Sequence, residues 1–252
     1  MKELITTRNF DKKVLDKILK DIDIWNDNIH KSKNFSFVKF GDGEFFCMMG
    51  EEGGNCDFHP YSKELGEKLL DAWYFFNTLD NIYIAEWANH KPGMTSVTKS
   101  EKYQYELMDK TPDVNISFVN FEILLQNTLS QNKFNFFKSI KDSKRKKIFV
   151  GPTRLFEIEK FLNVDKLIEI PLVNSFSEYD NILESLKSEV VDNSIIMFSS
   201  GMPAKSLIHK VLEFNSNVTC LDFGSGFDSL FFGRTREGQM SLNVVKKYYD
   251  EL

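Results

Sequence analysis

Two carboxylates separated by a single glycine occur early in the chain, in the stretch Gly41-Asp42-Gly43-Glu44. This stretch follows an apolar run at 35–38 that suits a mostly buried strand, and its two glycines allow a ligand to approach the backbone closely. Side chains two residues apart in an extended chain point to the same side, and Mg²⁺ or Mn²⁺ needs only one or two such carboxylates besides water and phosphate oxygens. The stretch therefore predicts a divalent-metal site at Asp42 and Glu44, with a solvated Asp-Gly turn as the alternative.

A serine-glycine segment, Ser199-Ser200-Gly201, comes directly after an apolar run and before a predicted helix that has Pro203 in its first turn. The free N–H groups and the dipole at a helix start attract anions, so this segment is a candidate phosphate site. The alternative is that one of the two serines only caps the helix.

Two further segments are candidates for other parts of a nucleotide. Gly151-Pro152-Thr153-Arg154 is a similar strand-to-helix turn, whose backbone groups could hold a base or a ribose. Arg234 and Arg236, two positions apart, can reach one diphosphate, because guanidinium groups form paired hydrogen bonds with phosphate oxygens. A solvated basic surface is the alternative for the arginines.

Hydrophobic spacing predicts the helices and strands that position these segments. An amphipathic helix over 11–26 precedes the first strand, a second strand at 82–87 ends near Glu86, and further helices are predicted at 62–77, 99–110 and 122–140. Apolar runs at 147–150, 167–170, 195–198 and 218–222 then alternate with helical segments, which is typical of βαβ units. We predict a single α/β domain over 1–252, with a Rossmann-like, mostly parallel sheet flanked by helices. Ligands bind at the carboxyl ends of the strands in such a sheet, so the segments above should meet at one edge.

The composition is that of a globular protein, since 252 residues of which 42% are hydrophobic can form a sizeable core. The net charge of −5 argues against a nucleic-acid-binding surface. No signal peptide is visible, and no apolar run reaches the roughly 18 residues that a membrane span requires. The three cysteines, Cys47, Cys56 and Cys220, are scattered, which favours a reducing compartment, so we expect a cytoplasmic protein.

The segment 221–228, Leu-Asp-Phe-Gly-Ser-Gly-Phe-Asp, resembles the first motif of adenosylmethionine-dependent methyltransferases. In that fold several βαβ units follow the glycine loop, but too few residues remain here, since each unit takes about 30. A zinc site at Cys47, Cys56 and His59 is also disfavoured, because their spacing fits no common site and a fourth ligand is missing.

The pattern as a whole, over roughly 35–236, resembles the GT-D fold glycosyltransferases. The resemblance is carried by Phe40-Gly-Asp-Gly-Glu-Phe45, by Ser199-Ser-Gly-Met-Pro-Ala-Lys205, and by the segment 221–228 followed by Arg234-Thr-Arg236. In that family a Rossmann-like domain uses an Asp-x-Glu motif to hold a divalent metal against the diphosphate of a nucleotide sugar, and UDP-glucose is a known type of donor. The resemblance implies that Asp42 and Glu44 hold Mn²⁺ or Mg²⁺. The residues that it assigns to the donor are Gly41, Gly43, Gly151, Thr153, Ser199, Ser200, Gly201, Lys205, Asp222, Arg234 and Arg236.

The implied reaction moves a sugar from the nucleotide to a glycan or glycoprotein acceptor, while the metal neutralises the departing diphosphate as a Lewis acid. If the reaction inverts the sugar, a general base takes the proton of the acceptor hydroxyl, and Glu86, Asp57 and Asp228 are the candidates. Acceptor choice is expected to be encoded in the long aromatic middle segment, and an oligomer is possible. Two other functions remain open, a methyltransferase and a nucleotide-binding protein without catalysis.

Overall fold

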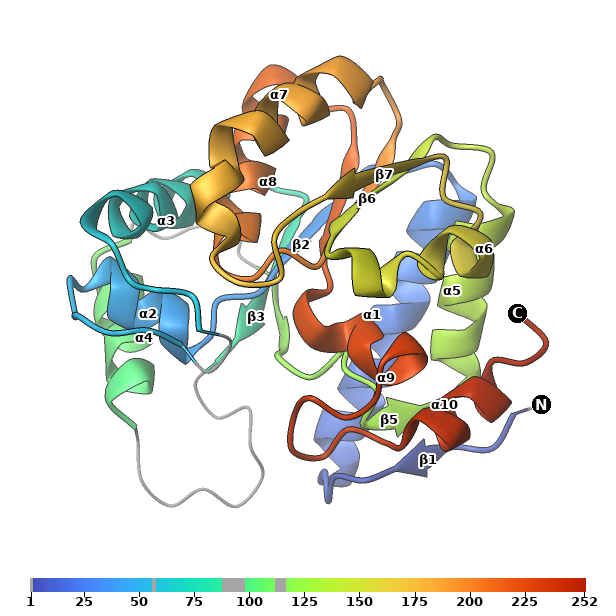
Figure 1. Ribbon diagram of the computed structural model, residues 1–252. Coiled ribbons are helices and arrows are strands. Elements are labelled where there is room, and N and C mark those ends of the chain that lie inside the picture. The colour runs from blue at the N-terminus through green and yellow to red at the C-terminus, as the bar shows by residue number, and fades with distance from the viewer. Residues whose placement is uncertain (1, 56–57, 88–97, 112–116) are drawn as a thin grey trace.

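A parallel sheet of seven strands forms the centre of the molecule in the computed structural model, which describes residues 2–55, 58–87, 98–111 and 117–252 (Figure 1). The strand order is β4-β3-β2-β9-β8-β6-β7, and every neighbouring pair is parallel. This arrangement confirms the predicted α/β class and the predicted parallel sheet. The strands are β2 (Ser36–Val38), β3 (Ile82–Glu86), β4 (Ser117–Asn120), β6 (Lys147–Gly151), β7 (Lys166–Glu169), β8 (Ile195–Phe198) and β9 (Thr219–Asp222).

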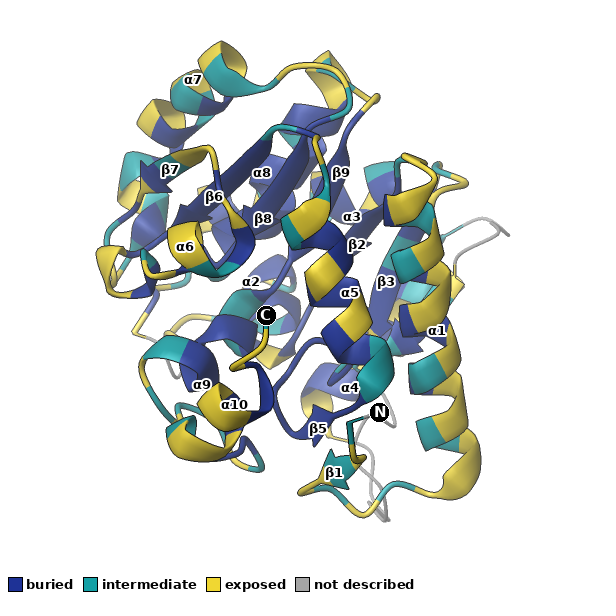
Figure 2. Cartoon of the chain, turned by 90° about the vertical axis from the view of Figure 1, so that its right-hand side faces the viewer, coloured by how far each residue is buried: buried dark blue, intermediate teal, exposed yellow. Residues whose placement is uncertain are grey.

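Helices cover both faces of the sheet (Figures 1 and 2). Each face is apolar, because the side chains of the central strands alternate between the two faces. In β8, Ile195 and Met197 belong to one core cluster, and Ile196 and Phe198 belong to the other. The first face is covered by α1 (Lys12–His30), α5 (Gln131–Asp142), α6 (Ile158–Leu162), α9 (Asp228–Phe231) and α10 (Leu242–Tyr248). The second face is covered by α2 (Asp42–Met48), α3 (Lys63–Phe76), α4 (Lys99–Asp109), α7 (Tyr179–Glu189) and α8 (Pro203–Phe214).

Several helices begin where a short polar side chain can accept a hydrogen bond from the first turn. Asp11 accepts from the Val14 N–H at the start of α1, and Ser62 accepts from the Leu65 N–H at the start of α3. The helices predicted over 11–26 and 62–77 are therefore confirmed, with α1 extending further than the apolar pattern indicated. Among the helices described, none is both long enough and apolar enough to cross a membrane.

The helix predicted over 122–140 is wrong in its first half. Turns and the short strand β5 (Thr128–Leu129) occupy that half, and β5 pairs antiparallel with β1 (Ile5–Thr6). The helix α5 begins only after Ser130, whose side chain accepts from the Lys133 N–H. Polar side chains explain the difference: Glu122 forms an ion pair with Arg8, and the Gln126 amide donates to the Gly226 carbonyl. These bonds to distant residues replace a local helical hydrogen-bond ladder.

Candidate functional site

Asp42 and Glu44 lie in the first turn of helix α2 and not in a separate turn, which corrects the extended geometry expected from the sequence. Residues two apart on a helix do not face each other, and here Asp42 is exposed while Glu44 is buried. The glycines beside them do not use a left-handed backbone, since Gly41 has φ −108° and Gly43 is helical. A Cβ at Gly43 would lie 2.9 Å from the Asn55 Cβ, so close packing against the following loop explains that glycine.

Both oxygens of Glu44 are engaged inside the protein. Its Oε2 accepts from the Gly41 N–H at 3.0 Å, and its Oε1 accepts from the Lys205 Nζ at 2.5 Å. Burial by itself raises the pKa of Glu44, but the charge and hydrogen bond of Lys205 outweigh it and hold that pKa below its usual value. Glu44 is therefore an ionised partner of a buried lysine.

Lys205 and Asp222 complete this buried ion-pair cluster. The Lys205 Nζ lies 3.1 Å from the Asp222 Oδ2 and donates to the Gly201 carbonyl at 3.2 Å. Burial opposes the charge of Lys205, but Asp222 and Glu44 raise its pKa. Asp222 also accepts from the backbone N–H groups of Lys39 and Gly224, so it joins the ends of β2 and β9. Asp222 thus supports the site from inside the protein and lines neither of the cavities described next.

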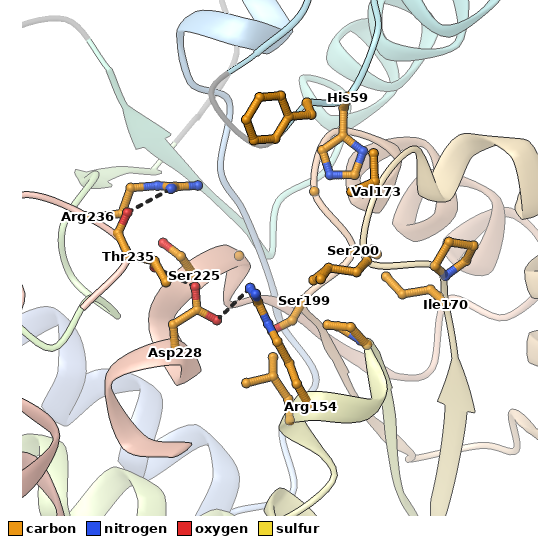
Figure 3. A pocket seen from close by; sticks show the side chains of 17 residues that line it. His59, Arg154, Ile170, Val173, Ser199, Ser200, Ser225, Asp228, Thr235 and Arg236 are labelled. Atoms are coloured by element: carbon orange, nitrogen blue, oxygen red, sulfur yellow. Dashed lines mark hydrogen bonds and ion pairs between the residues drawn. The ribbon is translucent and has the colours of Figure 1, made fainter. Parts of the chain in front are cut away.

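A cavity of about 340 Å³ lies beyond the carboxyl ends of β6, β7, β8 and β9, and we call it the Arg154 cavity (Figure 3). Part of its lining is apolar, and that part consists of Phe58, Pro152, Leu155, Ile170, Pro171, Leu172 and Val173. Its remaining lining is polar or glycine, and that part consists of His59, Arg154, Ser199, Ser200, Gly201, Gly224, Ser225, Asp228, Thr235 and Arg236. The cavity therefore suits a ligand with an apolar end and a charged end.

The predicted phosphate segment lies in this cavity with its hydroxyls unused. The side chains of Ser199 and Ser200 are buried, and their hydroxyls have no hydrogen-bond partner within the described ranges. Helix α8 begins after Met202 without a side-chain cap, so the alternative that a serine caps this helix is wrong. Gly201 has φ +65°, a backbone conformation that favours glycine, and a Cβ there would lie 2.9 Å from the His59 Nε2, so that ring would have to shift. Two buried hydroxyls and a helix start are together suited to an anion.

Asp228 is held by two neighbours inside the same cavity. Arg154 points at it, with the guanidinium Nη2 3.6 Å from Oδ1, and the Thr235 hydroxyl donates to Oδ2 at 2.5 Å (Figure 3). These contacts already occupy both oxygens of the Asp228 carboxylate. Of the other candidate bases, Glu86 is exposed at the end of β3 and lines neither cavity, and Asp57 lies outside the described residues.

A second cavity, of about 240 Å³, contains Asp42, and we call it the Asp42 cavity. It is lined by Gly41, Gly43 and Glu44, by the basic residues Arg8, Lys39 and Lys205, and by the aromatic residues Trp87 and Phe121. Gly201, Gly224, Ser225 and Arg236 line both cavities, and we call these four residues the shared wall. The two cavities are thus neighbours along the carboxyl edge of the sheet.

Besides Asp222, three predicted donor residues lie away from both cavities. Gly151 is a packing position, because a Cβ there would lie 2.3 Å from the Phe149 ring. The Thr153 hydroxyl donates to the Glu169 carboxylate on β7, and Arg234 is exposed. No role was predicted for the side chains of Arg154 and Lys39, although each follows a buried strand at the edge where ligands bind.

The residues present fit a hard divalent cation through Asp42 rather than through both carboxylates. The Asp42 Oδ1 accepts from the Gly43 N–H at 2.9 Å, and Oδ2 has no partner in the described part of the chain. One carboxylate is enough for Mg²⁺ or Mn²⁺ when phosphate oxygens supply further ligands. Glu44 would have to leave Lys205 to join, and the described residues contain no group of three His, Cys, Asp or Glu that could hold a metal by themselves.

The fold of the chain is similar to that of three solved structures. No protein-family model matches the chain, and no curated protein matches it. A solved structure of the domain of unknown function 1792 has a TM-score of 0.57 at 16% identity, over 92% of this chain and 87% of that one. A Streptococcus sanguinis protein of the same domain type, described as a new glycosyltransferase, has a TM-score of 0.58 at 16% identity, over 82% and 81%.

A third structure of this domain type is described as having a distinct glycosyltransferase fold. Its TM-score is 0.54 at 18% identity, over 84% of this chain and 78% of that chain. These identities are low, so what the chain shares with the three structures is the arrangement of its helices and strands. The chain has the fold of the 1792 domains, which is the fold that its motifs led us to expect.

Proposed function

We propose that the protein is a metal-dependent glycosyltransferase that moves a sugar from a UDP-sugar, such as UDP-glucose, to a glycan or glycoprotein acceptor. Two of the structures with this fold are described as glycosyltransferases or as having a glycosyltransferase fold, which supports the reaction type. The observation that carries the proposal is the pair of neighbouring cavities with one shared wall. Such a pair can hold a donor across the wall and leave space for an acceptor next to the bond that breaks.

We expect the donor to lie across the two cavities in one direction. Its nucleoside would enter the Arg154 cavity, where apolar side chains and Phe58 surround the space. Its diphosphate would lie at the shared wall, near the Arg236 guanidinium and the unused hydroxyls of Ser199 and Ser200. Its sugar would then enter the Asp42 cavity, where Trp87 and Phe121 offer aromatic surfaces.

The chain's own residues would bind and orient the leaving diphosphate. A metal bound at Asp42 would supply Lewis-acid neutralisation of that group. Arg236 and the start of α8 would add donors that are already in place before the reaction, which is how enzymes stabilise developing charge. That Glu44 is a second metal ligand stays a prediction. To bind the metal, its Oε1 would have to give up the hydrogen bond from Lys205.

The alternative without catalysis is a nucleotide-binding protein. The ion pair between Glu44 and Lys205 favours it, because an ammonium group already neutralises one of the two carboxylates expected to hold the metal. The methyltransferase alternative gains no support. Its acidic motif residue, Asp222, is fully buried and bonded to Lys205 and two backbone groups, so it does not face a ligand.

Thermal unfolding with UDP, Mn²⁺ and both together tests the proposal. Each ligand supplies part of the other's coordination, so we expect the pair to stabilise the protein more than the sum of the two alone. At roughly 100 times the dissociation constant the gain is about 2.7 kcal/mol, and each kcal/mol corresponds to about 2–4 °C. Release of free sugar from UDP-glucose in the same samples separates an enzyme from a protein that only binds. A shift with adenosylmethionine and none with UDP would contradict the proposal.

A further inference from the structure

Lys39 is a buried lysine at the carboxyl edge of the sheet, directly after β2. Its exposed fraction is only 9%, and it lines the Asp42 cavity. Its backbone N–H donates to the Asp222 Oδ2 at 3.2 Å, which fixes the start of its side chain at the joint of β2 and β9. The side chain then extends toward the shared wall, where a Cβ at Gly224 would lie 2.8 Å from Nζ.

The ammonium group of Lys39 lacks the partner that a buried charge normally has. In the described ranges no carboxylate lies within ion-pair distance of its Nζ and no acceptor is hydrogen-bonded to it; its recorded contact is the Phe121 ring, with the centroid 5.0 Å away. Lys205, by contrast, binds two carboxylates in the same region. A charge that is buried without a partner lowers the stability of the protein. A lysine at this position therefore points to an anionic ligand that pairs with its ammonium group.

A second cation shares this space with Lys39. Burial lowers the pKa of Lys39, Asp222 and Glu44 act against that lowering, and the positive charges of Lys205 and Arg236 add to it. Arg236 lies in the shared wall. Gly224, with φ +51°, lies in the same wall, and because glycine has no side chain it does not separate the Lys39 Nζ from the cavity. Two cations directed at one cavity attract an anion. Of the nearby carboxylates, Glu44 and Asp222 are occupied by Lys205, and Asp42 is the one that we propose to bind the metal.

We propose that Lys39 and Arg236 together bind a phosphate group at the shared wall, which makes Lys39 a substrate-binding residue. For the choice of ligand this rests on the proposed function, in which the phosphate belongs to the diphosphate of a nucleotide sugar. The chemistry that the site recognises is a diphosphate, which can come from a nucleotide or from inorganic diphosphate. The two sources are separated by titrating each of them.

The test is calorimetric titration of the wild type and Lys39→Met with UDP, uridine and inorganic diphosphate at constant Mg²⁺. Methionine keeps much of the length and apolar stem of lysine but removes the charge. We expect UDP and inorganic diphosphate to bind about 10- to 100-fold more weakly to the variant, as for the loss of a hydrogen bond to a charged group. Uridine, which lacks phosphate, should bind equally to both proteins.

A second buried lysine of the same sheet provides the matched control. Lys147 is 4% exposed at the start of β6, at the opposite edge, and its Nζ donates to the Ser143 carbonyl at 2.7 Å. Lys147→Met should leave the affinity for diphosphate unchanged. Lys39→Met should melt no lower than the wild type, because it removes an unpaired buried charge, and Lys39→Gln serves the same test if methionine does not fold.

The outcomes separate the two proposals. If UDP binds equally to the wild type and to Lys39→Met, the role of Lys39 is overturned and the proposed function is unaffected. If inorganic diphosphate binds in a manner that depends on Lys39 while UDP does not bind, the anion site stands and the nucleotide-sugar function fails. If neither ligand binds the wild type, both proposals are overturned.

Discussion

At the scale of single residues, Asp42 and Glu44 have different surroundings although one glycine separates them. Asp42 is exposed in its cavity with one oxygen unused, whereas Glu44 is buried against Lys205. A substitution at each position should therefore affect different properties. Asp42 should matter for ligands and Glu44 for folding.

The first prediction compares the stability of Asp42→Asn and Glu44→Gln. Loss of one partner from a buried ion pair is strongly destabilising, so Glu44→Gln should lower the free energy of unfolding by about 3 kcal/mol. Asp42→Asn should change it by less than about 0.5 kcal/mol, as is usual for exposed residues. Urea unfolding of both variants measures the difference. Equal stabilities would mean that the ion pair with Lys205 contributes nothing.

The second prediction compares the two arginines that the sequence put together. Arg236 lines both cavities, whereas Arg234 is exposed and lines neither. Arg236→Ala should weaken UDP binding by about 1.5–3 kcal/mol, the value for a hydrogen bond to a charged group. Arg234→Ala is the control and should bind UDP like the wild type. If Arg234→Ala weakened UDP binding and Arg236→Ala did not, the diphosphate would not bind at the shared wall.

At the scale of elements, the sequence predicted what depends on local pattern and missed what depends on distant partners. The apolar runs at β6, β8 and β9 were visible because strands buried on both faces are continuously apolar. The start of α5 could not be predicted from the local pattern. The residues before α5 have side chains that bind Arg8 and Gly226, which lie far away in the chain. The segment after β8 was predicted to be an anion site from its sequence, but the ion pair of Lys205 with Glu44, 161 positions apart, could be found only from the fold.

The third prediction concerns Lys133 in α5, whose Nζ donates to the carbonyls of Leu125 and Thr128. Burial lowers the pKa of Lys133 from 10.5 to about 7, although Glu122 opposes the shift. Between these two values the unfolded chain binds more protons at this lysine than the folded chain does, so stability should rise with pH across this window. Urea unfolding from pH 6 to 9 measures the rise for the wild type.

Lys133→Met provides the control for this pH dependence. The variant lacks the titrating group, so its stability should increase less between pH 7 and 9 than that of the wild type. A wild type and a variant with the same pH dependence would show that Lys133 keeps an ordinary pKa in the folded protein.

At the scale of the whole molecule, net charge and local charge have opposite signs. The chain carries a net charge of −5, yet Arg154, Arg236 and Lys39 gather at the carboxyl edge of the sheet. The parallel topology causes this, because it brings the ends of β2, β6, β8 and β9 to one side although they are far apart in the sequence. The alternation of strands and helices in the sequence predicted that edge. The division of the edge into two cavities depends on side chains from several loops and could not be predicted.

We propose that Asp42 binds a metal that sugar transfer requires, and sugar release from UDP-glucose across a Mn²⁺ titration tests this role. Wild type and Asp42→Asn should be compared, with melting temperatures recorded on the same samples. Asparagine keeps the shape of aspartate but removes the charge that a hard cation needs, so turnover should fall by about 10²–10³-fold at an unchanged melting temperature. Wild-type turnover and an unchanged Mn²⁺ dependence in Asp42→Asn would show that Asp42 does not hold the metal.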